Sequence, residues 1–248
     1  MLILACDTSG SACSVCFYKD GKVLGESFLS VGLTHSQTFM PLLEDLRKNI
    51  GVQFDEIDIF ACSVGPGSFT GIRIGVSAVK TMAMVKKRPA LPVSSLQALA
   101  YPFDGTENQL IVSVMDARNR RVYSGAFLEG REVVAQKAQT VEELWKELSD
   151  FNRCEDRKIA NQENRNIKIR FCGDAAFLYA KEAEEQGFHL VPTDKTSLDI
   201  RASSVAALAF EIAKDQDPND LYTRFSPASL TPAYLVKTSA ERLREQQV

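Results

Sequence analysis

Two aspartates stand where an apolar run gives way to small residues, and they are the first candidates for chemistry. Asp7 ends the run LILAC and is followed by TSG, and Asp116 ends the run LIVSVM. A carboxylate at such a turn can hold a magnesium ion against nucleotide phosphates. It can equally cap its own turn through hydrogen bonds from the side chain to the backbone. The spacing alone leaves both interpretations open.

The glycine-rich turn GPGSFTG at 65–71 is the second candidate, as a phosphate-binding loop. A P-loop requires GxxxxGK followed by Ser or Thr, but Gly71 is followed by Ile72 and Arg73. A dinucleotide-binding turn requires GxGxxG, and Thr70 stands where the third glycine belongs. The interpretation that remains from the spacing is a plain turn between a strand and a helix.

The cysteines and histidines give little support for metal or redox chemistry. Cys13 and Cys16 have the CxxC spacing of such sites, but residues three apart on a strand point to opposite faces. His35 and His189 are the only histidines, so the sequence has no HxxxH or HExxH pair. A catalytic zinc site normally takes three protein ligands. We therefore expect no catalytic and no metal-binding residue in this chain.

The glycine turn lies between a predicted buried strand at 57–63 and a long helix that continues to residue 85. Apolar and small residues cover roughly 200° of this helix, whereas a surface helix needs only about 100° to meet its core. Either the helix is buried between parts of its own chain, or the surplus face packs on another subunit. The remaining polar edge consists of Arg73, Ser77, Lys80, Met84 and Lys87.

We expect the second arrangement, in which a partner packs on this helix and on the one before it. Thr34 and Gln37 fit a capping box at the start of that earlier helix, and Gly51 stands where it would end. Pro41 would remove one helical hydrogen bond, so the regular part is expected to begin near Phe39. Small residues on the second helix would let a partner's backbone approach closely. The predicted interface consists of Phe39, Leu42, Leu43, Leu46, Gly71, Ile74, Gly75, Ala78 and Met82.

The second half of the sequence repeats the first. A shift of 109 positions places Asp116 on Asp7 and Gly130 on Gly21. Each half then has a strand ending in an aspartate, a second strand, a glycine turn and a third strand, followed later by a strand, a glycine and a helix. This order predicts an α/β protein with two duplicated lobes, each a mixed sheet flanked by helices.

A polar linker at 101–109 gives the boundary between the lobes. We expect an N-terminal, partner-binding lobe at 1–103 and a C-terminal lobe at 104–248. The C-terminal lobe is expected to contain an exposed polar loop at 152–166. The extended tail at 227–237 is expected to return to the N-terminal lobe.

Charge and composition limit the function classes further. The chain has 248 residues and a net charge of −3, which argues against strong nucleic-acid binding by the chain alone. The N-terminus lacks the features of a secretory signal, and no apolar run reaches the roughly 18 residues of a membrane span. Because the six cysteines stand mostly in apolar runs, we expect reduced thiols and a cytoplasmic protein that does not bind membranes. The best candidate for an RNA contact is the basic cluster of Arg118, Arg120 and Arg121.

Four segments spread over nearly the whole chain resemble the bacterial TsaB family, also called YeaZ. The resemblance implies the fold of actin, sugar kinases and heat-shock ATPases, known as the ASKHA or ribonuclease H-like fold, with two duplicated lobes. This agrees with the internal repeat. The segments are Asp7 to Ser9 after the opening strand, GPGSFTGIRIG at 65–75, MDAR at 115–118 with Tyr123, and PAYL at 232–235.

The resemblance also implies a function. Members of this family are non-catalytic partners of TsaD, which binds the metal and transfers a threonylcarbamoyl group to the adenine next to the anticodon of tRNAs reading codons that start with A. A small ATPase, TsaE, joins the pair. ATP and the metal then enter through the partner subunits, and tRNA is bound only through the complex. The first two helices of the N-terminal lobe are expected to pack on those of TsaD, or on a second copy when the chain is alone.

Departures from kinases of this fold support the helper role. Such kinases have a glycine soon after the second aspartate, where this chain has Arg118. They also have a double glycine near the adenosine, where Asp174 follows Gly173. The chain itself is thus expected to need no cofactor. We interpret four residues as a vestigial nucleotide site: Asp7, Thr8, Asp116 and Gly173.

The competing hypothesis is a self-sufficient enzyme of the same fold, either a small-molecule kinase or a nucleotide-binding protein. A metalloprotease of this fold is disfavoured because the histidine pair is missing. A third hypothesis is a general chaperone-like scaffold, which a pull-down lacking TsaD would favour. Turnover of ATP by the isolated chain would separate the kinase from the helper subunit.

Overall fold

The first half of the chain forms a mixed five-stranded sheet in a computed structural model that describes residues 1–153, 168–192, 194 and 198–235. The strand order is β3-β2-β1-β4-β5, with β1 antiparallel to β2 and parallel to β4. The strands are β1 (Leu2–Asp7), β2 (Cys13–Lys19), β3 (Lys22–Leu29), β4 (Ile59–Gly65) and β5 (Ala90–Ser94).

The second sheet repeats this pattern with four strands in the order β8-β7-β6-β9. β6 is antiparallel to β7 and parallel to β9, as β1 is to β2 and β4. Asp116 ends β6 as Asp7 ends β1, so the predicted duplication of two α/β lobes is confirmed. The strands are β6 (Gln109–Asp116), β7 (Arg121–Leu128), β8 (Arg131–Thr140) and β9 (Lys168–Cys172).

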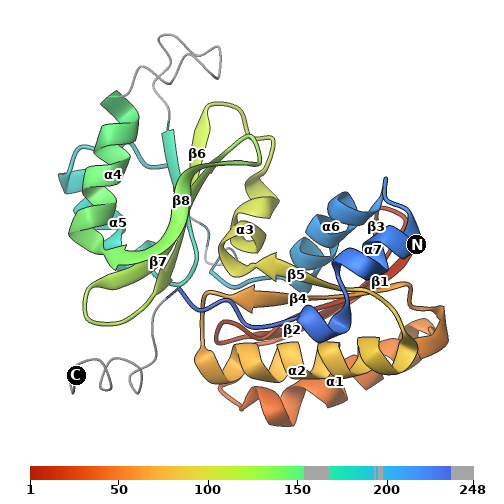
Figure 1. The fold of residues 1–248 in the computed structure, drawn as a ribbon. Coiled ribbons are helices and arrows are strands. Elements are labelled where there is room, and N and C mark those ends of the chain that lie inside the picture. Colours follow the sequence, from red (N-terminus) through yellow and green to blue (C-terminus); the bar gives the residue numbers. More distant parts are fainter. Residues whose placement is uncertain (154–167, 193, 195–197, 236–248) are drawn as a thin grey trace, which may run out of the picture.

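Helices cover both faces of the first sheet (Figure 1). Helices α1 (His35–Ile50) and α2 (Phe69–Lys86) lie on one face, and α6 (Ala202–Ala213) lies on the other. Alternate residues of β1 supply the two cores: Leu4 packs with α1 and α2, and Ala5 packs with α6. Helix α6 therefore packs on the first sheet although it lies beyond the predicted boundary at residue 104.

One apolar core continues from the first sheet to the second. Helix α3 (Ser95–Ala100) contributes Leu96 and Leu99, and the second sheet contributes Ile111 and Phe127. The short helix η2 (Tyr101–Phe103) then leads into the second sheet. The other face of that sheet is covered by α4 (Val141–Arg153) and α5 (Ala176–Glu185).

The start of α1 differs from the prediction. The helix begins at His35, a full turn before Phe39, and Pro41 lies inside it. Pro41 is exposed while Phe39 and Leu43 are buried, so packing of the apolar stripe offsets the lost hydrogen bond. The predicted capping box is not formed, because Thr34 Oγ1 donates to Gln37 Oε1 rather than capping a backbone N–H.

The predicted divergence of Cys13 and Cys16 is confirmed. Cys13 packs in the core under α1 and α2, and Cys16 packs in the core under α6. All five cysteines in the described part of the chain are free and buried, and Cys154 lies outside it. Burial raises the pKa of the Cys13 thiol to about 11 and that of Cys16 to about 12, so both stay protonated at neutral pH.

The segments after α6 stay against the first sheet, where Leu221 and Leu230 are buried in its two cores. Helix α7 (Pro218–Arg224), the short helix η1 (Phe54–Glu56) and the short helix η5 (Pro227–Ser229) complete the described elements. Most of the predicted loop at 152–166 and the end of the predicted tail beyond residue 235 lie outside the described residues. No helix in the described ranges is long and apolar enough to cross a membrane.

Candidate functional site

The turn between β4 and α2 joins the sheet to the predicted partner-binding helix. Ser68 caps α2, because its side-chain oxygen accepts a hydrogen bond from the Gly71 N–H at 3.2 Å. The Ser68 N–H donates to the carbonyl oxygen of Ser9 at 2.7 Å. The turn is thus attached to the loop that follows β1, and it fixes the direction in which α2 leaves the sheet.

Two glycines predicted to face a partner instead face the chain's own first loop. A Cβ on Gly71 would lie 2.0 Å from the carbonyl oxygen of Thr8, and a Cβ on Gly75 would lie 2.5 Å from Thr8 Oγ1. These distances are far below van der Waals contact, so each position has room only for hydrogen. The structure corrects this part of the predicted interface: the small residues admit Thr8, not a partner's backbone.

The predicted interface residues of α1 are also mostly internal. Phe39, Leu43 and Leu46 are buried in the core shared with β1, β2 and α2. Leu42 alone among the four is only partly buried. Spacing on a helix identifies the apolar stripe but does not say which of its members meet the sheet.

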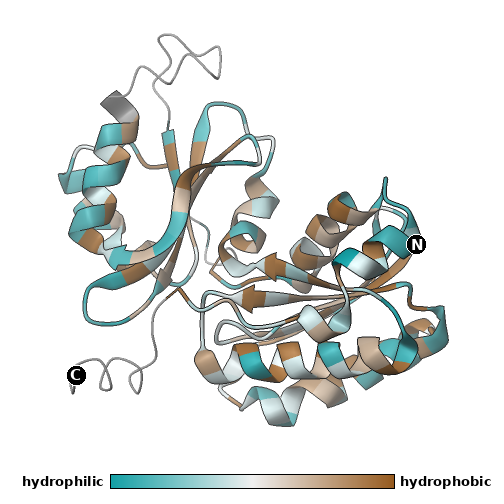
Figure 2. Ribbon diagram, viewed as in Figure 1, coloured by the Kyte–Doolittle hydropathy of each residue, from teal (hydrophilic) through white to brown (hydrophobic). Residues whose placement is uncertain are grey.

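A narrower apolar surface remains accessible on the two helices. Ile74, Ala78 and Met82 of α2 are partly buried, as is Leu42 of α1. Hydrophobic segments recur along both helices in Figure 2. Four exposed apolar residues on these helices lie outside the predicted interface: Met40 at 48%, Phe69 at 38%, Met84 at 55% and Val85 at 71% relative exposure. Met84 is one of the residues on the predicted polar edge of α2.

The side chains of Asp7 and Thr8 both form hydrogen bonds within their own lobe. Asp7 is buried, and its Oδ1 accepts hydrogen bonds from the Ser9 hydroxyl at 2.6 Å and from the Ser9 N–H at 3.3 Å. Burial raises the pKa of the Asp7 carboxyl above its ordinary value. Thr8 Oγ1 donates to the carbonyl oxygen of Gly71 at 2.7 Å. This geometry matches the capping interpretation of Asp7.

The corresponding turn of the second lobe has the same character. Asp116 Oδ1 accepts a hydrogen bond from the Arg118 N–H at 2.8 Å, and the Asp116 N–H donates to Asp174 Oδ1 at 2.9 Å. A Cβ on Gly173 would lie 2.2 Å from the carbonyl oxygen of Val114, so this glycine lets β9 approach β6 closely. The structure thus brings Asp116 and Gly173 together through Asp174, at the carboxyl ends of β6 and β9.

Within the described ranges, no group of three or more histidine, cysteine, aspartate or glutamate side chains is arranged to hold a metal ion.

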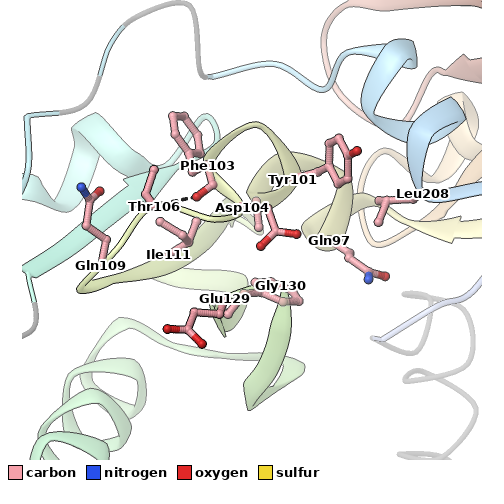
Figure 3. Close-up of a pocket in the computed structure, with 12 residues that line it drawn as sticks. Gln97, Tyr101, Phe103, Asp104, Thr106, Gln109, Ile111, Glu129, Gly130 and Leu208 are labelled. Atoms are coloured by element: carbon pink, nitrogen blue, oxygen red, sulfur yellow. Dashed lines mark hydrogen bonds between the residues drawn. The ribbon is translucent and has the colours of Figure 1, made fainter. Parts of the chain in front are cut away.

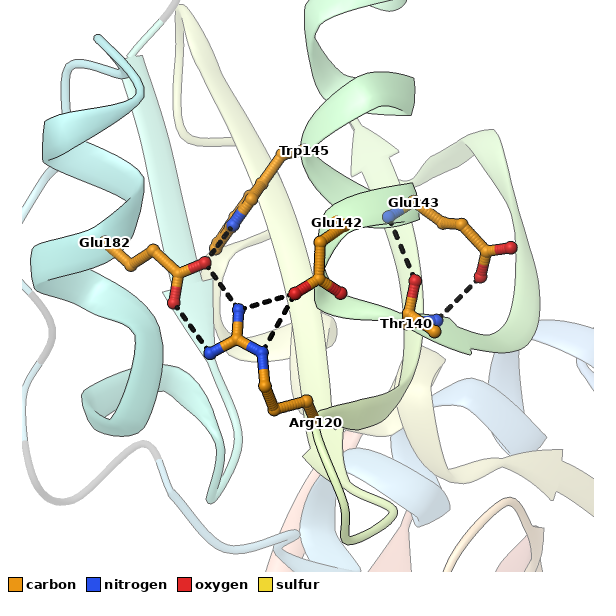
Figure 4. A network of polar contacts seen from close by, with 6 residues as sticks. All are labelled: Arg120, Thr140, Glu142, Glu143, Trp145 and Glu182. Atoms are coloured by element: carbon orange, nitrogen blue, oxygen red, sulfur yellow. Dashed lines mark hydrogen bonds and ion pairs between the residues drawn. The ribbon is translucent and has the colours of Figure 1, made fainter.

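Among the arginines of the basic cluster, Arg120 is held by two carboxylates (Figure 4). Arg120 donates two hydrogen bonds to Glu182 and one to Glu142, and Trp145 Nε1 donates to the same Glu182 at 2.9 Å. These carboxylates raise the pKa of Arg120 and join the β6–β7 turn to α4 and α5. Arg118 and Arg121 are exposed, and their side chains form no ion pair with a described residue.

A narrow pocket near the predicted boundary at residue 104 was not anticipated (Figure 3). Tyr101, Phe103 and Leu208 line it from the helical side, and Gly130 lines it from the β7–β8 turn. Asp104 points toward Gly130, where a Cβ would lie 2.6 Å from its carboxylate. No sequence motif marks this pocket, because its walls come from four separate segments.

The chain matches known proteins over most of its length. Residues 30–222 match the family model of TsaD, tRNA N6-adenosine threonylcarbamoyltransferase. The tRNA threonylcarbamoyladenosine biosynthesis protein TsaB of Haemophilus influenzae is 29% identical over 165 residues, which are 61% of this chain and 70% of that protein. TsaB of Bacillus subtilis is 35% identical over 130 residues, 51% of this chain and only 55% of that protein.

A solved structure extends the similarity to the whole fold. YeaZ from Pseudomonas aeruginosa superimposes with a TM-score of 0.68 at 26% identity, over 94% of this chain and 99% of YeaZ. The superposition on YeaZ covers both lobes described above. The chain belongs to the TsaB (YeaZ) family, within the wider group that includes TsaD.

Proposed function

We propose that this chain is a non-catalytic scaffold subunit that acts with TsaD and TsaE in making threonylcarbamoyladenosine in tRNA. The modified base is the adenine next to the anticodon of tRNAs that read codons starting with A. ATP and the metal are used by the partner subunits, and this chain holds no cofactor of its own. It forms a homodimer when alone, and it meets tRNA only within the complex.

The accessible apolar surface on α1 and α2 carries this proposal. Leu42, Ile74, Ala78 and Met82 are only partly covered by their own chain, and Val85 beside them is largely exposed. Apolar side chains gathered on two neighbouring helices form the kind of surface that a partner's helices bury. In this proposal residues 1–103 form the partner-binding lobe, and residues 104–248 form the second lobe with a tail on the first.

The contacts of the loop after β1 support a role without catalysis. Asp7 accepts hydrogen bonds from Ser9, and Thr8 donates to Gly71, so both side chains stabilise the chain's own turn. A nucleotide and its magnesium ion would have to displace these bonds and bring charge to a buried carboxyl. We infer that the vestigial nucleotide site now holds the β4–α2 turn in place.

Co-purification with TsaD of the same organism, followed by tRNA modification with and without this chain, tests the proposal. We expect a stable complex and threonylcarbamoyladenosine only when the chain is present. ATP hydrolysis by the isolated chain with a small-molecule substrate would instead support the competing kinase hypothesis. Binding of a partner set that lacks TsaD would also contradict the proposal.

A further inference from the structure

The segment 231–235, which includes the PAYL motif, crosses the start of α2 and contacts the GPGSFTGIRIG motif there. The carbonyl oxygens of Ala228 and Leu230 accept hydrogen bonds from Lys80 Nζ at 2.8 and 3.2 Å. The Leu230 side chain is buried in the core under α1 and α2. These contacts fix the point from which the segment extends.

Beyond Leu230 the segment is attached to the β4–α2 turn. The Ala233 N–H donates to the carbonyl oxygen of Val64 at 2.8 Å. A Cβ on Gly65 would lie 2.6 Å from the carbonyl oxygen of Ala233, so the segment can lie this close only because residue 65 is glycine. The glycine turn thus has a second close neighbour, which comes from the opposite end of the chain.

A clamp of three side chains closes the segment onto α2. The rings of Tyr234 and Phe69 stack with centroids 4.8 Å apart, and the guanidinium of Arg73 lies 3.8 Å from the Phe69 centroid. Arg73 Nε also donates to the Tyr234 hydroxyl at 2.9 Å. Phe69, Arg73 and Tyr234 remain exposed, so solvent reaches the clamp from outside.

We propose that residues 231–235 are a latch that opens and closes on the β4–α2 turn while both sheets stay folded. The residues past Leu230 are exposed or half-buried, and one backbone hydrogen bond and one side-chain clamp hold them. Segments with few buried contacts and solvent-exposed hydrogen bonds open at lower free energy than the core. Leu230 and the Lys80 bonds stay in place and act as the hinge.

The latch controls how firmly the turn is held. In the closed state the turn is fixed from two sides, by Ala233 at Val64 and by the Ser9 carbonyl at the Ser68 N–H. Opening removes the outer contact and leaves Phe69, the first residue of α2, without its stacking partner. The Ser68 N–H and the first turn of α2 then open more often, although no sheet hydrogen bond is broken.

Hydrogen exchange measured by mass spectrometry on the full chain tests the latch without any partner. Tyr234→Ala removes the clamp, and we expect exchange at Ala233, Ser68 and Ile72, whose N–H groups are hydrogen-bonded, to become about fivefold faster, since an aromatic pair contributes about 1 kcal/mol. Exchange in β1 and β4 should not change. Tyr234→Phe, which keeps the ring and loses the hydrogen bond from Arg73, should show a smaller acceleration.

Two control proteins distinguish a latch from a general loss of stability. Tyr222→Ala removes a tyrosine of similar exposure on α7 and should leave the turn unchanged. Truncation after Leu230 removes both the clamp and the Ala233 bond, so it should accelerate exchange at the turn at least as much as Tyr234→Ala. The proposal is overturned if Ala233 exchanges as slowly as β4 in the unmodified chain, or if Tyr234→Ala leaves exchange at Ser68 and Ile72 unaffected.

Discussion

The side chain of Thr8 is bonded to the backbone of α2, since Thr8 Oγ1 donates a hydrogen bond of 2.7 Å to the carbonyl oxygen of Gly71. The loop after β1 and the first turns of α2 therefore form one unit. Glycine at 71 and 75 makes this possible by leaving space for Thr8. The motif around residues 65–75 orients a helix through these contacts.

Replacing Gly71 by alanine should destabilise the fold. The new Cβ would lie 2.0 Å from the Thr8 carbonyl oxygen, a backbone atom that cannot rotate away. We expect the free energy of unfolding to fall by about 3 kcal/mol, as for other forced overpacking. Urea unfolding measures this. Gly10→Ala is the matched control, because a Cβ there meets nothing within 4 Å, and an equal loss in both variants would refute the explanation.

Asp7 should make the protein less stable as pH rises. Burial raises the pKa of Asp7 in the folded state, so between its ordinary pKa near 4 and the raised value the folded protein binds more protons than the unfolded chain. Below that pH window the Asp7 carboxyl is protonated and does not lower the free energy of unfolding. Above the window the buried charge lowers it. Asp7→Asn should therefore be more stable than the unmodified protein at pH 7, with the difference shrinking toward pH 3.

Urea unfolding of both proteins over pH 3–8 tests this prediction. Asparagine keeps a side-chain oxygen that can accept the hydrogen bonds from Ser9, so the comparison isolates the charge. A stability difference that is constant over the whole range would show that the carboxyl does not titrate abnormally.

A charge placed on the accessible face of α2 should prevent assembly with the partner. Ala78→Arg adds a long charged side chain to a partly buried position between Ile74 and Met82. We expect affinity for TsaD to fall by about 100-fold or more, the scale of an interface hot spot. Calorimetric titration measures it. Leu178→Arg changes an equally apolar, 62% exposed residue of α5 on the other lobe and should bind normally.

The exposed arginines of the β6–β7 turn should contribute to tRNA binding by the complex. Arg118 and Arg121 are free of ion pairs in the described part of the chain, whereas Arg120 is held by Glu142 and Glu182. Replacing Arg118 and Arg121 by alanine should weaken tRNA binding and lower the salt dependence by about one counterion per arginine. Arg120→Ala should leave the salt dependence nearly unchanged, and equal effects of all three would contradict this division.

The local sequence pattern predicted the two-lobe fold. The predicted interface failed where contacts between residues far apart in the chain decide the packing. The repeat of Asp7 and Gly21 at Asp116 and Gly130 was sufficient to predict two lobes, because the same succession of strands, turn and helix occurs in each half of the chain. The interface prediction was wrong at Gly71 and Gly75, since the helical arc does not show that Thr8 occupies it.

The sequence also does not predict the clamp of Phe69, Arg73 and Tyr234, because Tyr234 comes from a distant part of the chain. Arg73 and Tyr234 are 161 residues apart. The sequence predicts that the tail at 227–237 returns to the N-terminal lobe, but it does not show which side chains meet there. The angle of Arg73 on the helix places it on the polar edge of α2, and its side chain is indeed exposed. The angle does not predict that Phe69 and Tyr234 stack beside it.

The rate of threonylcarbamoyladenosine formation on tRNA by purified TsaD and TsaE of the same organism, with ATP, the threonylcarbamoyl donor and this chain, tests the central claim most directly. We predict product with the unmodified chain and with Leu178→Arg, and essentially none without the chain or with Ala78→Arg. Equal rates with and without the chain would contradict a scaffold role. A full rate with Ala78→Arg would show that the face of α2 is not where the partner binds.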